Sequence, residues 1–250
     1  MTASPPARPL ILDVNDVSKR FVIHKEKSLK ERVVNFGRSD LHKNDFWALR
    51  HVSLTIEAGS TLGLVGANGS GKSTLLKILG GILEATEGTV RRRGRIAALL
   101  ELGAGFHPDL TGRENVYLNA AILGVDQRTT RKNFDSIVAY SEIEPFIDTQ
   151  VKFYSSGMYL RLAFAVAVHS DPDILLVDEV LAVGDEQYQA KCIKTIKEFQ
   201  SDGGTLIIVS HSATQIESLC DRVLVLSHGD VVFDGLPGPG IVALRQSFND

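Results

Sequence analysis

The sequence has little cysteine and lacks a long hydrophobic run. Only two of its 250 residues are cysteines, Cys192 and Cys220, and they form neither a C-x-x-C pair nor a zinc-ligand spacing. We therefore expect two free thiols, buried or half-buried, in a reducing cytosol. No apolar stretch approaches the roughly 18 residues that a membrane span requires, and the Pro- and Ala-rich N-terminus lacks the apolar core of a secretory signal. These absences predict a soluble intracellular chain, for which any membrane role needs a partner.

An excess of positive charge and an internal repeat are also missing. The formal net charge is −3, which gives no indication of bulk attraction to nucleic acid. The three glycines at positions 66, 69 and 71 do not have the G-x-G-x-x-G spacing of a dinucleotide-binding fold. A hydrophobic fraction of 44% is ample for the core of one large domain or two small ones.

One stretch fits G-x-x-x-x-G-K-[ST], the phosphate-binding loop, or P-loop. It consists of Gly66, Ala67, Asn68, Gly69, Ser70, Gly71, Lys72, Ser73 and Thr74. A buried-strand pattern precedes it and a helical pattern follows it. Glycines let successive backbone N–H groups point inward, and the helix start adds positive potential. Lys72 supplies a charge for the β- and γ-phosphates, and the Ser73 hydroxyl is a hard ligand for Mg²⁺. The stretch therefore predicts a nucleoside triphosphate site.

Polar residues follow two apolar strands later in the chain. Asp178 and Glu179 follow residues 174–177, and His211 follows residues 205–209 after one serine. In a doubly wound sheet the carboxyl ends of the strands line the ligand crevice. We expect Asp178 to hold Mg²⁺ through water, and Glu179 to orient and deprotonate the attacking water. His211 would bond the γ-phosphate and position that water.

A second anion site is predicted by Ser155, Ser156 and Gly157, which precede the apolar residues 160–168. Small residues with free N–H groups at a helix start attract anions. A single chain with one P-loop has little use for two such sites on one nucleotide. In a homodimer both sites can be used, because each subunit's helix start can face the γ-phosphate held by the other.

Three segments near the N-terminus leave alternatives open. Residues 10–17 predict a strand, which residues 21–23 extend or follow with a second one, and Phe21 is either core or a platform for adenine. Residues 28–36 predict a basic amphipathic helix that lies near lipid headgroups or a partner, or else an ordinary surface helix. The basic run 91–95 is a solvated face or a contact to anionic lipid.

The middle of the chain lacks strand patterns. We expect helices over residues 108–133 and 134–147, with Thr111 and Glu114 forming a capping box. The α/β pattern returns at Pro172. The expected later elements are strands at 174–177 and 205–209, helices at 186–201, 213–220 and 240–248, and a hairpin of 222–226 with 231–233. The predicted fold is a single α/β domain over residues 1–250: a P-loop NTPase core, an N-terminal antiparallel β subdomain and an α-helical subdomain inserted at about 108–170.

From residue 10 to 233, the order and spacing of these motifs resemble the nucleotide-binding subunits of ABC transporters. The matching motifs are Walker A (66–74), Walker B with its catalytic glutamate (174–179), the D-loop (182–185) and the switch histidine (His211). Residues 154–158 stand where the family has LSGGQ, departing from it at Tyr154, Ser156 and Met158 but keeping Ser155 and Gly157. The resemblance implies ATP and Mg²⁺ as ligands, nucleotide contacts by Ser155, Ser156, Gly157 and Asp185, and adenine stacking by Phe21.

The segment that corresponds to the family's Q-loop narrows the resemblance to one group within the family. Glu101 stands where the family usually has a Gln that contacts Mg²⁺ and senses the transmembrane partner, and a carboxylate can also ligate the metal. Residues 100–115, the altered signature and the insertion at about 25–45 resemble the polysaccharide-exporting group, which includes O-antigen (Wzt-type), capsule, teichoic acid and galactan exporters.

That group implies an ATPase subunit at the cytoplasmic face of the inner membrane, acting with a polytopic permease on a lipid-linked glycan. The helix at 28–36 would then be a gate facing the membrane. Some relatives append a carbohydrate-binding domain, and we expect none in a chain ending at Asp250. Two alternatives are another class of ABC transporter and a soluble ABC ATPase acting on nucleic acid or ribosomes. The second would favour a second cassette, long coiled coils or a basic surface.

Overall fold

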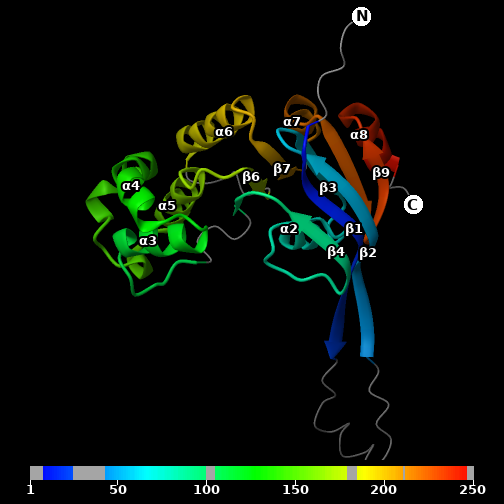
Figure 1. The fold of residues 1–250 in the computed structure, drawn as a ribbon, viewed down its shortest axis with the longest axis horizontal. Helices are drawn as coiled ribbons and strands as arrows, with labels where there is room; N and C mark the ends of the chain where they lie inside the picture. Colours follow the sequence, from blue (N-terminus) through cyan, green and yellow to red (C-terminus); the bar gives the residue numbers. More distant parts are fainter. Residues whose placement is uncertain (1–7, 25–42, 100–104, 179–184, 211, 247–250) are drawn as a thin grey trace, which may run out of the picture.

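The computed structural model describes residues 8–24, 43–99, 105–178, 185–210 and 212–246. In these residues two sheets lie beside a group of helices (Figure 1). The strands are β1 (Leu10–His24), β2 (Lys43–Glu57), β3 (Thr61–Gly66), β4 (Glu87–Arg92), β5 (Ile96–Ala98), β6 (Ile174–Val177), β7 (Thr205–Val209), β8 (Arg222–Ser227) and β9 (Asp230–Gly235). The helices are α2 (Lys72–Leu79), α3 (Gly112–Ile122), α4 (Gln127–Ser141), α5 (Ser156–Val168), α6 (Glu186–Ser201), α7 (Ala213–Leu219), α8 (Pro237–Gln246) and the 3-10 turns η1 (Glu144–Phe146) and η2 (Val151–Phe153).

The first sheet is antiparallel, with strand order β2-β1-β4. Residues 21–23 extend β1 rather than starting a separate strand, and Phe21 lies directly opposite Phe46 of β2. Figure 1 shows the paired ends of β1 and β2 projecting from the body as a two-stranded ribbon. Since cross-strand partners share a face of the sheet, the two phenylalanine side chains face the same side of this ribbon.

The second sheet has strand order β5-β6-β7-β3-β8-β9 and is parallel except for β9. Strands β3, β6 and β7 are buried along their whole length, as their continuous apolar sequences predict. One face of this sheet packs with α2 and the first sheet around a core that includes Leu64, Leu75 and Ile207. The other face forms a core with α5, α6 and α7. The carboxyl ends of the parallel strands therefore lie at the same end of the sheet, where the P-loop begins.

Helices α3, α4 and α5 pack around a separate apolar core, on the left in Figure 1. The predicted helix ends in this region were wrong: the break between α3 and α4 lies at residues 123–126, not at 133. Asp126 caps α4, its side chain accepting hydrogen bonds from the backbone N–H groups of Arg128 and Thr129. The capping box of Thr111 and Glu114 at the start of α3 is confirmed. The predicted fold class, a P-loop core with an antiparallel β subdomain and an inserted helical subdomain, is confirmed, whereas its domain boundaries stay a prediction.

From Leu162 to Val168, helix α5 is apolar on all sides because it lies between two cores. Phe164 and Ala167 pack against the parallel sheet and α6, whereas Leu162 and Val166 pack into the helical subdomain. A helix that is hydrophobic all round is a buried one. In the described residues, no helix combines the length and the apolar character that crossing a bilayer requires.

The basic run at 91–95 has a structural role that neither sequence interpretation included. The guanidinium of Arg92 donates hydrogen bonds to the carbonyl oxygens of Ile78 and Leu79 (2.8 Å for Leu79), at the end of α2. A cation at this position satisfies carbonyl groups that have no partner within the helix. Arg95 pairs with Asp171 at 2.7 Å.

Candidate nucleotide-binding site

The P-loop joins β3 to α2 and is wedged between two other segments. The carbonyl oxygen of Ser70 accepts a hydrogen bond from the backbone N–H of Gly229 (3.0 Å), in the turn between β8 and β9. The carbonyl of Gly229 in turn accepts from the N–H of Arg50 in β2 (2.9 Å). A Cβ on Gly71, which has φ +108°, would lie 2.5 Å from the carbonyl oxygen of Ala48. Sequence reasoning identified the turn at Gly229 only as a hairpin and missed this support for the loop.

Lys72 is the first residue of α2 and is only 7% exposed. Its Nζ donates to the carbonyl oxygens of Gly66 (2.8 Å) and Ala67 (2.9 Å), so the ammonium group lies inside the loop. Burial lowers the pKa of Lys72, and the nearby Asp178 carboxylate opposes that shift. Both effects indicate that the charge of Lys72 is held in a partly desolvated position, where an anion stabilises it strongly.

The backbone of the loop fits a phosphate group better than the Ser70 side chain does. The Ser70 hydroxyl is buried without a hydrogen-bond partner, but it lies 2.5 Å from where a Cβ on Gly66 would stand and does not line the cavity described below. Gly69 has φ +81° with open space where a Cβ would stand, so the backbone is free for a close approach from outside. An anion in the loop would accept from the backbone N–H groups at the start of α2, where Gly71, Lys72 and Ser73 line the cavity described below.

A cavity of about 230 Å³ opens over this loop. Lys72, Ser73 and Asp178 all line it, so the structure brings the P-loop and the tip of β6 together as the sequence predicted. The remaining lining residues are Phe46, Ala48, Asn68, Gly69, Gly71, Thr74 and Val209. The cavity thus has a cationic end, two oxygen ligands of the kind that magnesium prefers, and an apolar wall from β2.

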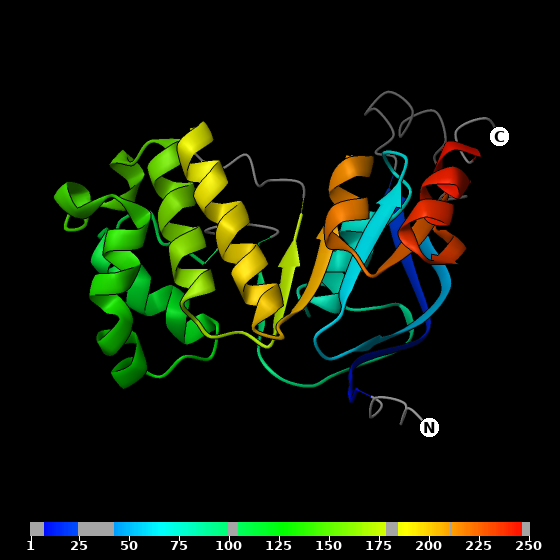
Figure 2. The ribbon, with the colours of Figure 1, turned by 90° about the horizontal axis from the view of Figure 1, so that it is seen from above.

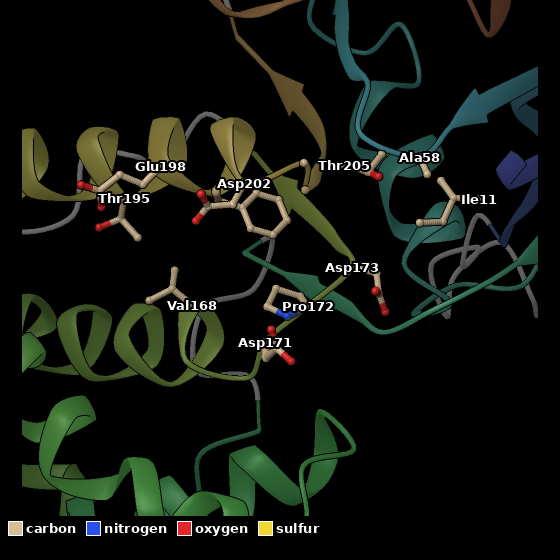
Figure 3. A pocket seen from close by; sticks show the side chains of 13 residues that line it. Ile11, Ala58, Val168, Asp171, Pro172, Asp173, Thr195, Glu198, Asp202 and Thr205 are labelled. Atoms are coloured by element: carbon tan, nitrogen blue, oxygen red, sulfur yellow. The ribbon is translucent and has the colours of Figure 1, made fainter. Parts of the chain in front are cut away.

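A larger cavity, about 490 Å³, lies where β6 and β7 begin, at the opposite edge of the parallel sheet (Figure 3). Its lining includes the carboxylates of Asp171, Asp173, Glu198 and Asp202. These side chains would repel a triphosphate, and none of the predicted site residues lies there. Charge therefore favours the smaller cavity as the nucleotide site.

The aromatic residue at the cavity is Phe46, which sequence reasoning missed. It is 49% exposed and belongs to β2. Phe21 is its cross-strand partner, 39% exposed, with the Lys19 ammonium 5.3 Å from its ring centroid. Phe21 is therefore not a core residue, and its contact with adenine stays a prediction. The pairing of Phe21 with Phe46 could not be predicted from the sequence, because 18 residues separate β1 from β2. Those 18 residues lie outside the described part of the chain.

Ser155, Ser156 and Gly157 form the start of α5. The Ser155 hydroxyl accepts from the N–H of Met158 (3.2 Å) as the helix cap, and Ser156 and Gly157 begin the helix. Both serines are exposed, and none of the three residues lines the cavity at the P-loop of the same chain. In this subunit, the second predicted anion site is therefore separate from the first.

Asp185 caps the start of α6, its Oδ1 accepting from the N–H of Tyr188 (2.9 Å). Its Oδ2 accepts from the guanidinium of Arg161 on α5 (2.7 Å). The bond from Tyr188 and the charge of Arg161 lower the pKa of Asp185. The start of α6 is thus tied to the helix that begins with Ser155.

Four predictions fall outside the described residues: Glu101, Glu179, His211 and the helix at 28–36. Asp185 is the one residue of the predicted D-loop that the structure describes. Cys192 and Cys220 are buried and free, as predicted.

Comparison with known proteins shows the family of the chain. Residues 49–182 match the family model described as ABC transporter. The chain is 48% identical to the ABC transporter protein AbcA of Aeromonas salmonicida, over 91% of this chain and 73% of AbcA. It is 43% identical to the O-antigen export system ATP-binding protein RfbB of Klebsiella pneumoniae, covering 86% of this chain and 89% of RfbB. It is 44% identical to the teichoic acids export ATP-binding protein TagH of Levilactobacillus brevis, covering 87% of this chain but only 60% of TagH.

Solved structures show the same fold. A dimeric ATP-binding cassette bound to ADP and Pi superposes with a TM-score of 0.71 at 24% identity, covering 91% of this chain and 99% of that one. An ATP-binding subunit of an ABC transporter gives 0.72 at 20% identity, covering 96% and 93%. Fold and site define a nucleotide-binding P-loop protein. The chain belongs to the ABC transporter family, and its resemblance to glycan-export ATP-binding proteins is confirmed.

Proposed function

We propose that this chain is the ATP-hydrolysing subunit of an exporter that moves a lipid-linked polysaccharide across the cytoplasmic membrane. The observation that carries the proposal is the pairing of a P-loop cavity with a separate, exposed helix start at Ser155. The names of RfbB and TagH, which refer to export of O-antigen and teichoic acids, support a glycan as the transported molecule.

Mg²⁺ would be held by the Ser73 hydroxyl and the Asp178 carboxylate, which line the same cavity, with Glu101 as a further candidate. Among the described residues, no three His, Cys, Asp or Glu side chains form a metal cluster. Such a sparse protein ligand set suits Mg²⁺, which keeps waters and binds through one or two carboxylates plus substrate phosphates. When bound, the ion would neutralise phosphate charge.

Hydrolysis would use Glu179 as the general base, since it follows Asp178 at the carboxyl end of β6. His211 after β7 would hold the γ-phosphate and the attacking water. Lys72 would bind the β- and γ-phosphates from inside the loop. These roles make positioning and charge stabilisation the main contributions of the protein.

Two copies of the chain would bind two ATP molecules between them. Ser155, Ser156, Gly157 and Asp185 of each copy would face the nucleotide on the P-loop of the other. ATP would favour the closed dimer and ADP the open one, because only the closed form gives the γ-phosphate both sets of contacts. The dimer would act on a polytopic permease from the cytoplasmic face of the membrane, with the predicted helix at 28–36 next to the permease.

Depletion of the chain in cells that make a surface polysaccharide tests the transported molecule. We expect the lipid-linked glycan to accumulate on the inner side of the cytoplasmic membrane and to be lost from the cell surface. The wild-type chain should restore the surface glycan, whereas Lys72→Ala should not. Unchanged surface glycan, with another lipid or drug retained instead, would assign the chain to another class of exporter.

A substitution at Glu179 tests the general base. Glu179→Gln should bind ATP and dimerise but fail to hydrolyse the nucleotide. Near-normal phosphate release from this variant would show that Glu179 is not the base.

A further inference from the structure

Arg161 joins three helices through its guanidinium group. It lies on α5, beyond the first turn that Ser156 and Gly157 begin. One terminal nitrogen donates to Asp185 at the start of α6 (2.7 Å), and the other donates to Glu142 at the end of α4 (3.1 Å). The side chain is only 18% exposed. A planar guanidinium can hold two carboxylates at a fixed separation, which a point charge cannot do.

The contact between α5 and α6 is reinforced by Tyr188. The guanidinium carbon of Arg161 lies 4.5 Å from the centroid of the Tyr188 ring, and the Tyr188 hydroxyl donates to the carbonyl oxygen of Arg161 (3.1 Å). The N–H of Tyr188 donates to Asp185, which accepts from Arg161 as well. Arg161, Asp185 and Tyr188 therefore form a closed ring of contacts, in which moving the first turn of α6 breaks a bond to α5.

Glu142 extends this ring to α4 at the expense of backbone strain. It ends α4 with φ +58°, a left-handed conformation in which glycine or asparagine is usual. Its carboxylate accepts from both Arg161 and Lys191, and Lys191 on α6 also donates to the carbonyl of Tyr140 (2.8 Å). A strained residue whose side chain bridges three helices indicates that the position is used for its carboxylate.

We propose that Arg161 is a positioning residue that fixes the start of α6 against the start of α5. The inference rests on the proposed function, in which Ser155, Gly157 and Asp185 all face the nucleotide of a partner subunit. Those three residues come from two helices that are remote in sequence, so their relative placement depends on the contacts between the helices. Displacement of a catalytic contact by about 1 Å can lower a rate by roughly 10²-fold. Arg161 would act through Asp185 and α5, without touching the nucleotide itself.

The test compares Arg161→Ala with Arg113→Ala in the full chain. Arg113 is a matched control because it also pairs with a carboxylate (Asp148, 2.7 Å) and lies over an aromatic ring (Phe134, 4.7 Å), but it does not reach α6. We expect Arg161→Ala to lower kcat by about tenfold or more, while the affinity for ATP stays within about twofold because the P-loop is intact. Arg113→Ala should leave both values within about twofold.

Hydrogen exchange provides a readout that does not depend on activity. In Arg161→Ala the amide of Tyr188 should exchange about tenfold faster than in the wild type, because the first turn of α6 opens locally. Arg161→Lys should recover part of kcat and of the protection, since an ammonium can reach one carboxylate but not bridge two. Arg113→Ala should leave α6 unchanged.

Equal kcat and equal Tyr188 exchange in Arg161→Ala and Arg113→Ala would overturn the proposal. The proposed function fails differently: a wild-type specific activity that does not rise with protein concentration would count against the dimeric ATPase. The exchange experiment would still decide whether Arg161 holds α6 in place.

Discussion

Two helix N-termini are predicted to meet the nucleotide phosphates, and the structure builds them in opposite ways. Helix α2 starts inside the protein, at Gly71, with no side-chain cap and with β2 and the Gly229 turn packed against its loop. Helix α5 starts at the surface, capped by the exposed Ser155. One start is enclosed by its own chain, whereas the other is open.

Space around two glycines makes the contrast quantitative. A Cβ on Gly71 would meet a backbone carbonyl at 2.5 Å, whereas a Cβ on Gly157 would have the Ser155 hydroxyl, at 3.9 Å, as its nearest neighbour. Gly71 is thus required by the fold of the chain itself. Nothing described in this chain requires a glycine at 157, which is the expected result if a second molecule makes the close approach. We therefore predict that one chain shapes the P-loop by itself, whereas the start of α5 contacts phosphate only when a second copy brings it there.

The largest effect is expected for Lys72→Ala, which removes the charge inside the enclosed start. Hydrogen bonds to charged groups contribute about 1.5–3 kcal/mol, so the affinity for ATP should fall by roughly 10- to 150-fold. Titration with a fluorescent ATP analogue measures this change. Lys194→Ala, which removes a surface lysine paired with Glu198 at 3.6 Å, is the control and should bind as the wild type does. Unchanged affinity in Lys72→Ala would mean that the nucleotide binds elsewhere.

Substituting Gly71 and Gly157 with alanine, one at a time, should separate an effect on stability from an effect on hydrolysis. Gly71→Ala should lower the free energy of unfolding by about 1–3 kcal/mol, because the residue keeps a left-handed φ with a carbonyl in contact. Gly157→Ala should leave stability unchanged or raise it by about 0.5–1 kcal/mol, since alanine suits a helix better. Urea denaturation measures both values.

Phosphate release then tests the open start. We expect Gly157→Ala to lose hydrolysis while its ATP affinity and its stability persist, because the added methyl group faces the partner's phosphate. A Gly157→Ala variant with full activity would contradict the half-site and would remove Gly157 from the predicted nucleotide contacts.

Removal of the α5 cap should have a smaller effect on stability. Ser155→Ala loses the bond to the N–H of Met158 and should lower the free energy of unfolding by about 1 kcal/mol. Asp126→Ala removes the cap of α4 and should be similarly destabilised, but only Ser155→Ala should also lower the rate of hydrolysis. Equal rates in the two variants would leave Ser155 as a cap alone.

Local sequence patterns predicted those elements whose residues carry their own signals. The bounds of β6, α6 and β7 came out as expected, because continuous apolar runs and cap residues mark their ends. The break between α3 and α4 was misplaced because helical periodicity continues past it. The cap at Asp126, followed by Thr129, was the available signal.

Contacts between distant segments could not be predicted in this way. Phe46 reaches the cavity through its register with β1, and Gly229 supports the P-loop from a turn that is about 160 residues away in the sequence. The bond between Arg161 and Asp185 depends on how α5 and α6 lie together, side by side in Figure 2. Motifs identify the residues of such a site, whereas tertiary packing decides which of them meet within one chain.

The two buried thiols allow the smallest difference between the regions to be measured. Cys220 packs against the strand that leads into the P-loop, its Sγ 3.0 Å from where a Cβ on Gly63 would stand, and Cys192 lies on α6. Burial raises the pKa of each thiol to about 12. At pH 8 a native thiol with that pKa is thiolate in roughly one molecule in 10⁴, so labelling requires local opening. A thiol whose pKa is higher in the folded than in the unfolded state contributes stability at pH values below the unfolded pKa, near 9. This contribution is lost as the pH rises toward 12, so both thiols should react faster above pH 9.

Single-cysteine variants, Cys192→Ala and Cys220→Ala, let each rate be followed with a thiol reagent at pH 8. We expect Cys220 to react a few-fold faster than Cys192, because Cys220 ends the short helix α7 and is 8% exposed, whereas Cys192 is fully buried between α6 and the parallel sheet. Faster reaction at Cys192 would reverse the comparison: α6 would then be the less rigid region, although Arg161 and Lys191 tie it to its neighbours.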